Sequence, residues 1–202
     1  IKKLINNNDV NIIAVSKSFQ YEHIKPLVDI GHNHFGENKV QEAPNKWSKI
    51  KDSKKTINLH MIGKLQSNKA KEAVSLFEYI HSVDNPKLAS LLSKFENSLN
   101  KKRKYFIQVN IGREKQKSGI AIDQLDSFYT HCTKELNLNV IGLMTIPPND
   151  ENKSVSFKNL MELNNSLGLY EISMGMSVDY MEAIKYKSTF VRIGSAIFGD
   201  RI

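Results

Sequence analysis

The stretch Asn11-Ile12-Ile13-Ala14-Val15-Ser16-Lys17 shows the pattern on which the whole chain is built. A short β-branched run predicts a buried strand over residues 11–15, and polar residues follow it at once. Further runs of this kind lie at residues 32–35, 58–62, 79–83, 105–110, 139–144, 170–174 and 189–193. The sequence therefore predicts eight strands.

Segments with helical spacing separate these runs. They cover residues 22–30, 38–50, 67–77, 86–99, 122–136, 152–167 and 178–187, and Leu88, Leu91, Leu92 and Phe95 show the i, i+3, i+4, i+7 pattern of one of them. Eight strands joined by helical crossovers predict an α/β fold, a (β/α)8 TIM barrel, in a single domain over residues 1–202. An open doubly wound sheet is the alternative, although it seldom needs eight strands in so short a chain.

Composition narrows the class of protein. The chain has 202 residues, of which 40% are hydrophobic and 25% are charged, and this excludes collagen and extended disorder. No apolar run approaches the roughly 18 residues of a membrane span, and the first residues lack a signal-peptide core. Cys132 is the only cysteine, so we expect it to pack as a small hydrophobe in a reducing compartment. The prediction is a cytoplasmic protein with no membrane partner.

The formal charge of +8 raises nucleic acid as a partner. Only four of the 29 basic residues are arginine, however, and the lysines are spread along the whole chain. Direct readout of bases favours arginine, and backbone binding needs a clustered patch. We therefore expect no nucleic-acid partner.

Two further motifs fail on inspection. Gly194 and Gly199 have the spacing of a P-loop, but Asp200-Arg201 stands where Lys-Ser/Thr is required. His32 and His34 would share one face of a strand, yet no third ligand lies at metal-binding spacing, so packed histidines are the favoured interpretation.

Polar residues follow most of the predicted strands and would meet at the C-terminal mouth of a barrel. They are Ser16-Lys17, Gly36-Glu37-Asn38, residues 63–69, residues 115–119, residues 174–177 and Gly194-Ser195. The C-terminal mouth carries the active site in such barrels, and the loops after strands 7 and 8 commonly bind phosphate. Gly175, Ser177, Gly194 and Ser195 are the predicted phosphate-binding residues, with turn glycines and a helix cap at Ser177 as the alternative for each one singly.

Lys17 directly follows the first apolar run, which would carry its ammonium into the mouth. Burial and a neighbouring cation such as Arg192 would lower its pKa and make it an amine able to form a Schiff base.

A family resemblance rests on motifs spread along the chain in order. They include Ala14-Val15-Ser16-Lys17, Phe35-Gly36-Glu37-Asn38, His60-Met61-Ile62-Gly63-Lys64-Leu65-Gln66-Ser67-Asn68-Lys69, Lys117-Ser118-Gly119, Ser173-Met174-Gly175-Met176-Ser177 and Val191-Arg192-Ile193-Gly194-Ser195. The sequence resembles the YggS/PROSC family of pyridoxal phosphate homeostasis proteins. Lys39, Leu59 and Lys64 depart from the residues usual in that family.

The resemblance implies a barrel similar to the N-terminal domain of alanine racemase, with pyridoxal 5'-phosphate (PLP) bound at its mouth. Carried over by residue, Lys17 would form the Schiff base and Arg192 would face the pyridine nitrogen. Ser177, Gly194 and Ser195 would hold the phosphate, while Asn38 and Met176 would line the ring.

The expected function is intracellular PLP homeostasis without robust catalysis, by a protein that is not an enzyme. We expect a monomer, with apo forms of PLP enzymes as candidate partners. An alternative is a PLP-dependent amino-acid racemase, and a third hypothesis is a cofactor-free, phosphate-binding barrel isomerase.

Overall fold

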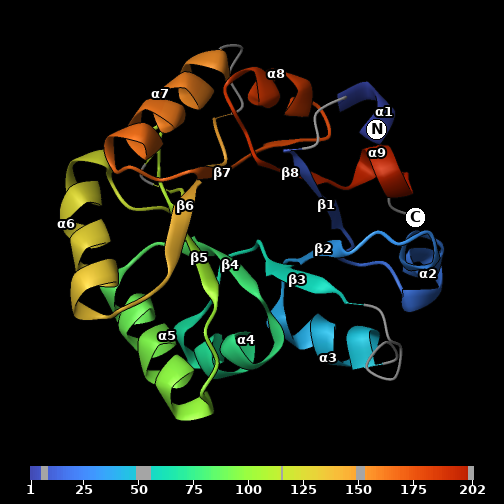
Figure 1. Ribbon diagram of the computed structural model, residues 1–202, viewed down its shortest axis with the longest axis horizontal. Helices are drawn as coiled ribbons and strands as arrows, with labels where there is room; N and C mark the ends of the chain where they lie inside the picture. The colour runs from blue at the N-terminus through green and yellow to red at the C-terminus, as the bar shows by residue number, and fades with distance from the viewer. Residues whose placement is uncertain (6–8, 49–55, 115, 149–152, 200–202) are drawn as a thin grey trace.

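Eight parallel strands close into a barrel in this computed structural model, which describes residues 1–5, 9–48, 56–114, 116–148 and 153–199. The strands follow one another in chain order around the barrel, and the last pairs with the first (Figure 1). Their bounds are β1 Asn11–Val15, β2 His34–Glu37, β3 Asn58–Met61, β4 Tyr79–Val83, β5 Lys104–Gln108, β6 Val140–Met144, β7 Glu171–Met176 and β8 Phe190–Ile193. The predicted (β/α)8 barrel is confirmed.

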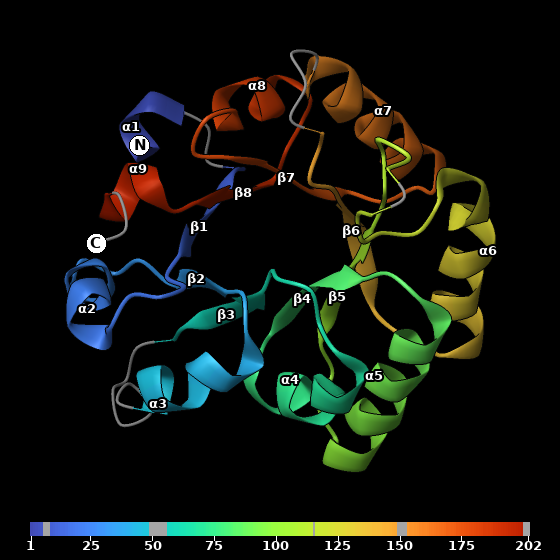
Figure 2. The same ribbon diagram turned by 180° about the vertical axis from the view of Figure 1, so that it is seen from behind.

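Helices form a ring outside the strands, as both views show (Figures 1 and 2). Their bounds are α1 Lys2–Ile5, α2 Tyr21–Asp29, α3 Ala43–Trp47, α4 Ala70–Leu76, α5 Pro86–Leu99, α6 Leu125–Thr130, α7 Lys153–Ser166, α8 Tyr180–Lys185 and α9 Ser195–Phe198. The longest agree closely with prediction. α5 fills the predicted 86–99, and α7 spans residues 153–166 of the predicted 152–167, residue 152 lying outside the described part. No helix in the described part of the chain is long and apolar enough to cross a membrane.

Each strand is buried on both sides, because its residues alternate between the barrel interior and the helices. Ile13, Phe106, Met144 and Phe190 pack with Tyr79 inside the barrel. The outward side chains join the helices in a larger core. A third cluster, around Ile12 and Val191, packs α1, α8 and α9 against β1 and β8.

Two strands run past their predicted ends, whereas β5 ends at Gln108, two residues before its predicted end. β2 spans His34–Glu37 rather than residues 32–35, because the Glu37 carboxylate finds buried partners and the strand continues to it. β7 continues through Met176 instead of ending at residue 174. Gly175 adopts a φ of +91°, and a Cβ there would stand 2.6 Å from the Cβ of Ala183, so the strand can continue close to α8 only with glycine.

Some predicted helices are broken. The predicted helix over 38–50 is a 3-10 turn at Val40–Glu42 followed by α3, and residues 49 and 50 lie outside the described part. The predicted helix over 122–136 comprises a 3-10 turn, α6 and a π-helical turn at His131–Glu135. These differences leave the C-terminal mouth of the barrel as predicted.

Candidate functional site

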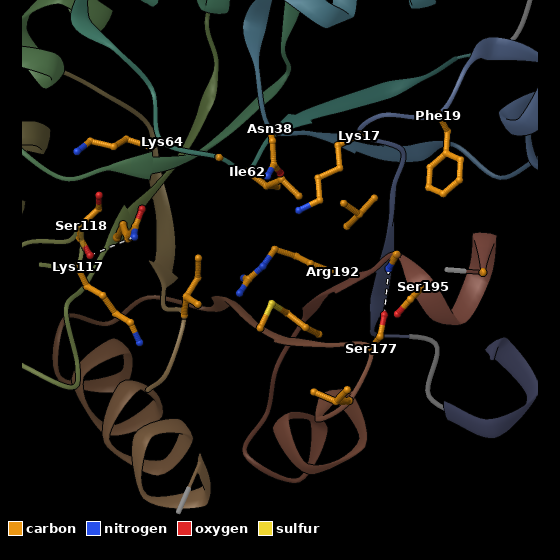
Figure 3. A pocket seen from close by; sticks show the side chains of 18 of the residues that line it. Lys17, Phe19, Asn38, Ile62, Lys64, Lys117, Ser118, Ser177, Arg192 and Ser195 are labelled. Atoms are coloured by element: carbon orange, nitrogen blue, oxygen red, sulfur yellow. Dashed lines mark hydrogen bonds between the residues drawn. The ribbon is translucent and has the colours of Figure 1, made fainter. Parts of the chain in front are cut away.

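One cavity of about 850 Å³ opens at the C-terminal mouth of the barrel. All seven of the predicted site residues line it: Lys17, Asn38, Met176, Ser177, Arg192, Gly194 and Ser195. They come from the ends of β1, β2, β7 and β8, so the closure of the barrel brings together residues from both ends of the chain (Figure 3).

Lys17 lies in a tight turn after β1. The amide of Ser16 donates to the carbonyl of Gly36 at 3.0 Å, and the amide of Phe19 donates to the carbonyl of Ser16 at 3.2 Å. Ser18 has a φ of 67°, which reverses the chain after Lys17. The Lys17 side chain points into the cavity on the same side as the guanidinium of Arg192 (Figure 3).

A buried ion pair supports this turn from behind. Glu37 is fully buried and accepts from Ser16 Oγ at 2.8 Å, Lys46 Nζ at 2.9 Å and Trp47 Nε1 at 3.0 Å. Lys46 Nζ also donates to the carbonyl of Ser16 at 2.7 Å. The sequence placed Glu37 in a mouth loop, and this was wrong: its carboxylate anchors the backbone next to Lys17.

Arg192 is a buried cation, only 4% exposed. Nη1 donates to the carbonyl and to Oγ of Ser173 at 2.9 and 2.8 Å, and Nη2 donates to the carbonyl of Thr145 at 2.8 Å. Burial lowers the pKa of Arg192 to about 10, and the negative charge of Asp179 opposes this. The guanidinium is therefore still charged at neutral pH and offers the cavity hydrogen-bond donors only.

Ser177 joins the loops after β7 and β8. Its Oγ accepts from the amides of Gly194 at 3.2 Å and Ala196 at 3.4 Å, and Ser195 lies beside it (Figure 3). The residue before α8 is Asp179, so the alternative in which Ser177 caps that helix is wrong. Hydroxyl groups and backbone amides are thus gathered at one end of the cavity.

Lysines and polar groups line the opposite end. Lys64, Lys117 and Ser118 lie there, across the cavity from Ser177 (Figure 3). Lys117 pairs with Glu114 at 2.6 Å. Lys39, the other unusual lysine, pairs with Glu42 at 3.5 Å, is 72% exposed and is absent from the lining, so Lys64 is the departure that touches the site.

Histidines inside the barrel connect to the site through Ser173, a contact that the sequence did not predict. His32 lies before β2 and makes a hydrogen bond to the carbonyl of His34, so the two do not share a strand face. His34 instead begins a chain of hydrogen bonds through His60 and His81 to Ser173, the partner of Arg192. In the described part of the chain, no group of three or more potential ligands could hold a metal ion.

Cys132 plays no part in the cavity. It is fully buried, and burial raises the pKa of its thiol to about 12, so it remains protonated.

These features define a class: a closed (β/α)8 barrel whose mouth combines a lysine at the end of the first strand with a buried arginine on the last. A family model described as "Alanine racemase, N-terminal domain" matches residues 1–202. Pyridoxal phosphate homeostasis proteins of Synechocystis sp. and Schizosaccharomyces pombe are 37% and 35% identical to this chain. The alignments cover 96% and 100% of this chain, and 92% and 88% of those proteins.

Solved structures agree. PipY of Synechococcus elongatus, solved with PLP bound, is 32% identical and superposes with a TM-score of 0.88 over 96% of this chain and 94% of its own. An alanine racemase of Clostridium difficile, at 15% identity and a TM-score of 0.75, covers 98% of this chain but 54% of its own, and shows the fold alone. The chain belongs to the pyridoxal phosphate homeostasis protein family, which confirms the resemblance drawn from its motifs.

Proposed function

We propose that this protein binds PLP at the barrel mouth, holds it as a Schiff base on Lys17 and serves PLP homeostasis without robust catalysis. The observation that carries the proposal is the chemistry of the cavity. Its described polar lining consists of lysines, one arginine, serines and amides, with no acidic side chain, tyrosine or histidine. Such a lining suits an anionic molecule rich in acceptors, which PLP is.

Each part of PLP has a matching group. Ser177, Gly194 and Ser195 offer hydroxyls and an amide to a phosphate, and charge-assisted hydrogen bonds of this kind are strong. Arg192 would donate to the pyridine nitrogen, and Asn38 and Met176 would flank the ring. When bound, PLP supplies an aldehyde carbon with which the amine of Lys17 can condense. PLP bound in the related PipY structure supports this assignment.

Arg192 also argues against efficient catalysis. The ring is a stronger electron sink when its pyridine nitrogen is protonated, which an Asp partner usually ensures, and a guanidinium cannot accept that proton. Racemases of the same barrel are expected to pair an arginine with the pyridine as well, so this argument weakens the sink without excluding a racemase. Racemisation further needs an acid/base group on each face of the substrate. The described lining provides only lysines for that task.

The racemase remains the second candidate because of Lys64. This lysine lines the cavity across from the Ser177 end and is a further amine that could serve as the second acid/base group (Figure 3). Rapid Cα exchange that depends on Lys64 would favour the racemase over the carrier.

Borohydride trapping tests the central assignment. Protein incubated with PLP and reduced should carry the pyridoxyl adduct on the peptide that contains Lys17, and Lys17→Ala should lose it. Lys64→Ala is the matched control, since it removes another amine from the same cavity. An adduct chiefly on Lys64 or Lys69 would overturn the assignment.

The proposal extends to partners. The printed name of the relatives refers to homeostasis, so we propose that apo forms of PLP enzymes receive PLP from this protein, acting as a monomer. Transfer to an added apo-enzyme faster than from free-diffusing PLP at the same free concentration, together with the monomer mass in light scattering, would support this.

A further inference from the structure

A row of hydrogen-bonded histidines crosses the barrel interior and ends at Ser173, a hydrogen-bond partner of Arg192. His34 Nδ1 lies 2.9 Å from His60 Nε2, His60 Nδ1 lies 2.9 Å from His81 Nε2, and His81 Nδ1 lies 2.9 Å from Ser173 Oγ. Arg192 Nη1 donates to the same Ser173 Oγ at 2.8 Å. We name His34, His60 and His81 the histidine chain.

The register of the strands places each member of the histidine chain closer to the C-terminal mouth than the one before it. His34 pairs with Asn58, two residues before His60, and His60 pairs with Tyr79, two residues before His81. Each step from one strand to the next therefore climbs two residues, about 6–7 Å along the strand, towards the C-terminal mouth. His34 is half-buried at the lower end, whereas His60 and His81 have no exposed surface.

Hydrogen-bond satisfaction fixes the direction of the chain. The guanidinium can only donate, so Ser173 Oγ accepts from it. Ser173 is fully buried, and its hydroxyl proton is satisfied by donation to His81 Nδ1, whereas a bond in the opposite sense would leave that proton without a partner among the described hydrogen bonds. His81 and His60 then carry their protons on Nε2, and each donates to the Nδ1 of the next histidine below. His34 accepts at Nδ1 and, as a neutral ring, carries its own proton on Nε2.

The imidazoles of the chain are neutral. Burial, followed by the charge of Arg192, lowers the pKa of His81 well below its usual value, and burial does the same for His60. Burial lowers the pKa of His34 to about 4. Three neutral rings with one shared direction align their dipoles, and the acceptor end of each points towards Arg192.

Hydrogen bonds to neutral groups stabilise the charge of Arg192, where a buried arginine would usually pair with a carboxylate. Within the described part of the chain, no carboxylate forms an ion pair with Arg192, although the side chain is almost completely buried. A buried charge without hydrogen-bonding partners is costly. Two backbone carbonyls and the polarised hydroxyl of Ser173 solvate it here.

We propose that the histidine chain is a set of positioning residues: it orients the Ser173 hydroxyl and so holds Arg192 as a fixed, cationic donor at the cavity. The proposal deepens the proposed function, because a guanidinium held in this way keeps a bound pyridine nitrogen unprotonated. An acid partner would have the opposite effect. The histidine chain therefore explains in structural terms why the site would retain PLP without activating it for catalysis.

The first experiment needs no cofactor. ¹⁵N NMR of the ring nitrogens in the cofactor-free full-length protein at neutral pH should show His60 and His81 neutral, with the proton on Nε2. In Arg192→Met, the charge that sets the direction is gone, and we expect a second tautomer to appear at His81. Protonation of His81 on Nδ1 in the original protein, or an unchanged single tautomer in Arg192→Met, would overturn the proposal.

The second experiment measures the effect on bound PLP. His81→Phe and Ser173→Ala should each weaken PLP binding by about tenfold, equivalent to roughly 1.4 kcal/mol, and shift the absorption maximum of the bound cofactor. The double variant should bind no more weakly than Ser173→Ala alone, because both changes break one link. His81→Asn keeps a polar group near Ser173 and should recover part of the affinity and of the original spectrum, which also covers a failure of His81→Phe to fold.

Tyr79→Phe is the matched control. The Tyr79 ring stacks on His60 at 4.3 Å, but its hydroxyl bonds Lys104 and not the histidine chain. It should change PLP affinity by less than about twofold. Equal effects of Tyr79→Phe and His81→Phe on affinity and spectrum would overturn the proposal. If the original protein fails to bind PLP, the proposed function fails, while the NMR experiment still decides the role of the chain.

Discussion

Replacing Lys46 by methionine tests whether the buried pair with Glu37 supports the turn that carries Lys17. The substitution removes the ammonium that bonds both carboxylate oxygens of Glu37, at 2.9 and 3.1 Å, and the carbonyl of Ser16 at 2.7 Å. Lys46 and Glu37 side chains are 8% and 0% exposed, so solvent cannot replace these bonds.

The expected loss of unfolding free energy depends on the hydrogen bonds that Glu37 keeps in the variant. Breaking a buried pair by removing one partner costs about 3–5 kcal/mol of unfolding free energy. Glu37 keeps Ser16 Oγ and Trp47 Nε1 as donors, which favours the lower figure, about 3 kcal/mol. In a chain of this size each kcal/mol lowers the melting temperature by about 2–4 °C, so a fall of roughly 6–12 °C is expected.

Thermal unfolding followed by circular dichroism measures this loss, and borohydride labelling of Lys17 by PLP measures its functional effect. We expect slower labelling at a temperature where the variant is still folded, because the Ser16 carbonyl has lost its anchor. Glu37→Gln combined with Lys46→Met should recover part of the stability, since it removes the unpaired charge. A fall of less than about 2 °C, with unchanged labelling, would refute the reasoning.

Three further outcomes are expected. Ser177→Ala combined with Ser195→Ala should weaken the binding of PLP by about tenfold or more but leave the binding of pyridoxal little changed. Lys17→Ala should still bind PLP non-covalently. Equilibrium dialysis measures both affinities, and equal affinity of the original protein for PLP and pyridoxal would contradict the phosphate assignment. Burial lowers the pKa of His34 to about 4, and His60 and His81 shift the same way, so the unfolded chain binds more protons below pH 6.5. Stability should be full above that pH and fall as the pH is lowered towards 4, and a constant melting temperature between about pH 7 and 5 would count against buried neutral histidines. Cα exchange of each L-amino acid in deuterated water should exceed that with free PLP by no more than about a hundredfold, far below the roughly millionfold minimum for enzymes, and rapid stereoinversion would favour the racemase.

The predicted strands succeed where the sequence signal is local. Runs such as residues 11–15 and 79–83 are mostly β-branched, aromatic or apolar and lie almost entirely in the buried part of the barrel, so their composition identifies them as strands. β2 was misplaced because Gly36-Glu37 has the composition of a turn. The burial of Glu37 depends on Lys46 and Trp47, which lie on the next helix, and strand composition alone does not reveal such partners.

The candidate site was accessible from the sequence for a geometric reason. In a parallel barrel, residues at or just after the C-terminal ends of the strands share one mouth, so Lys17, Arg192 and the loops around Ser177 and Gly194 could be placed together from the sequence. His60 and His81 were missed because each stands alone in its own strand. Both occupy the third position of a strand, and only the register between β3 and β4 aligns them.

The pairing of β1 with β8 determines when the cavity can form during synthesis of the polypeptide. Lys17 leaves the ribosome well before Arg192, Gly194 and Ser195, and the β1–β8 seam brings the two groups together. A growing or truncated polypeptide without β8 and the loop after it lacks Arg192, Gly194 and Ser195 of the cavity lining. Any ligand that spans the seam stabilises the closed barrel over open forms by mass action, so occupancy of the cavity would also report that β1 and β8 have paired.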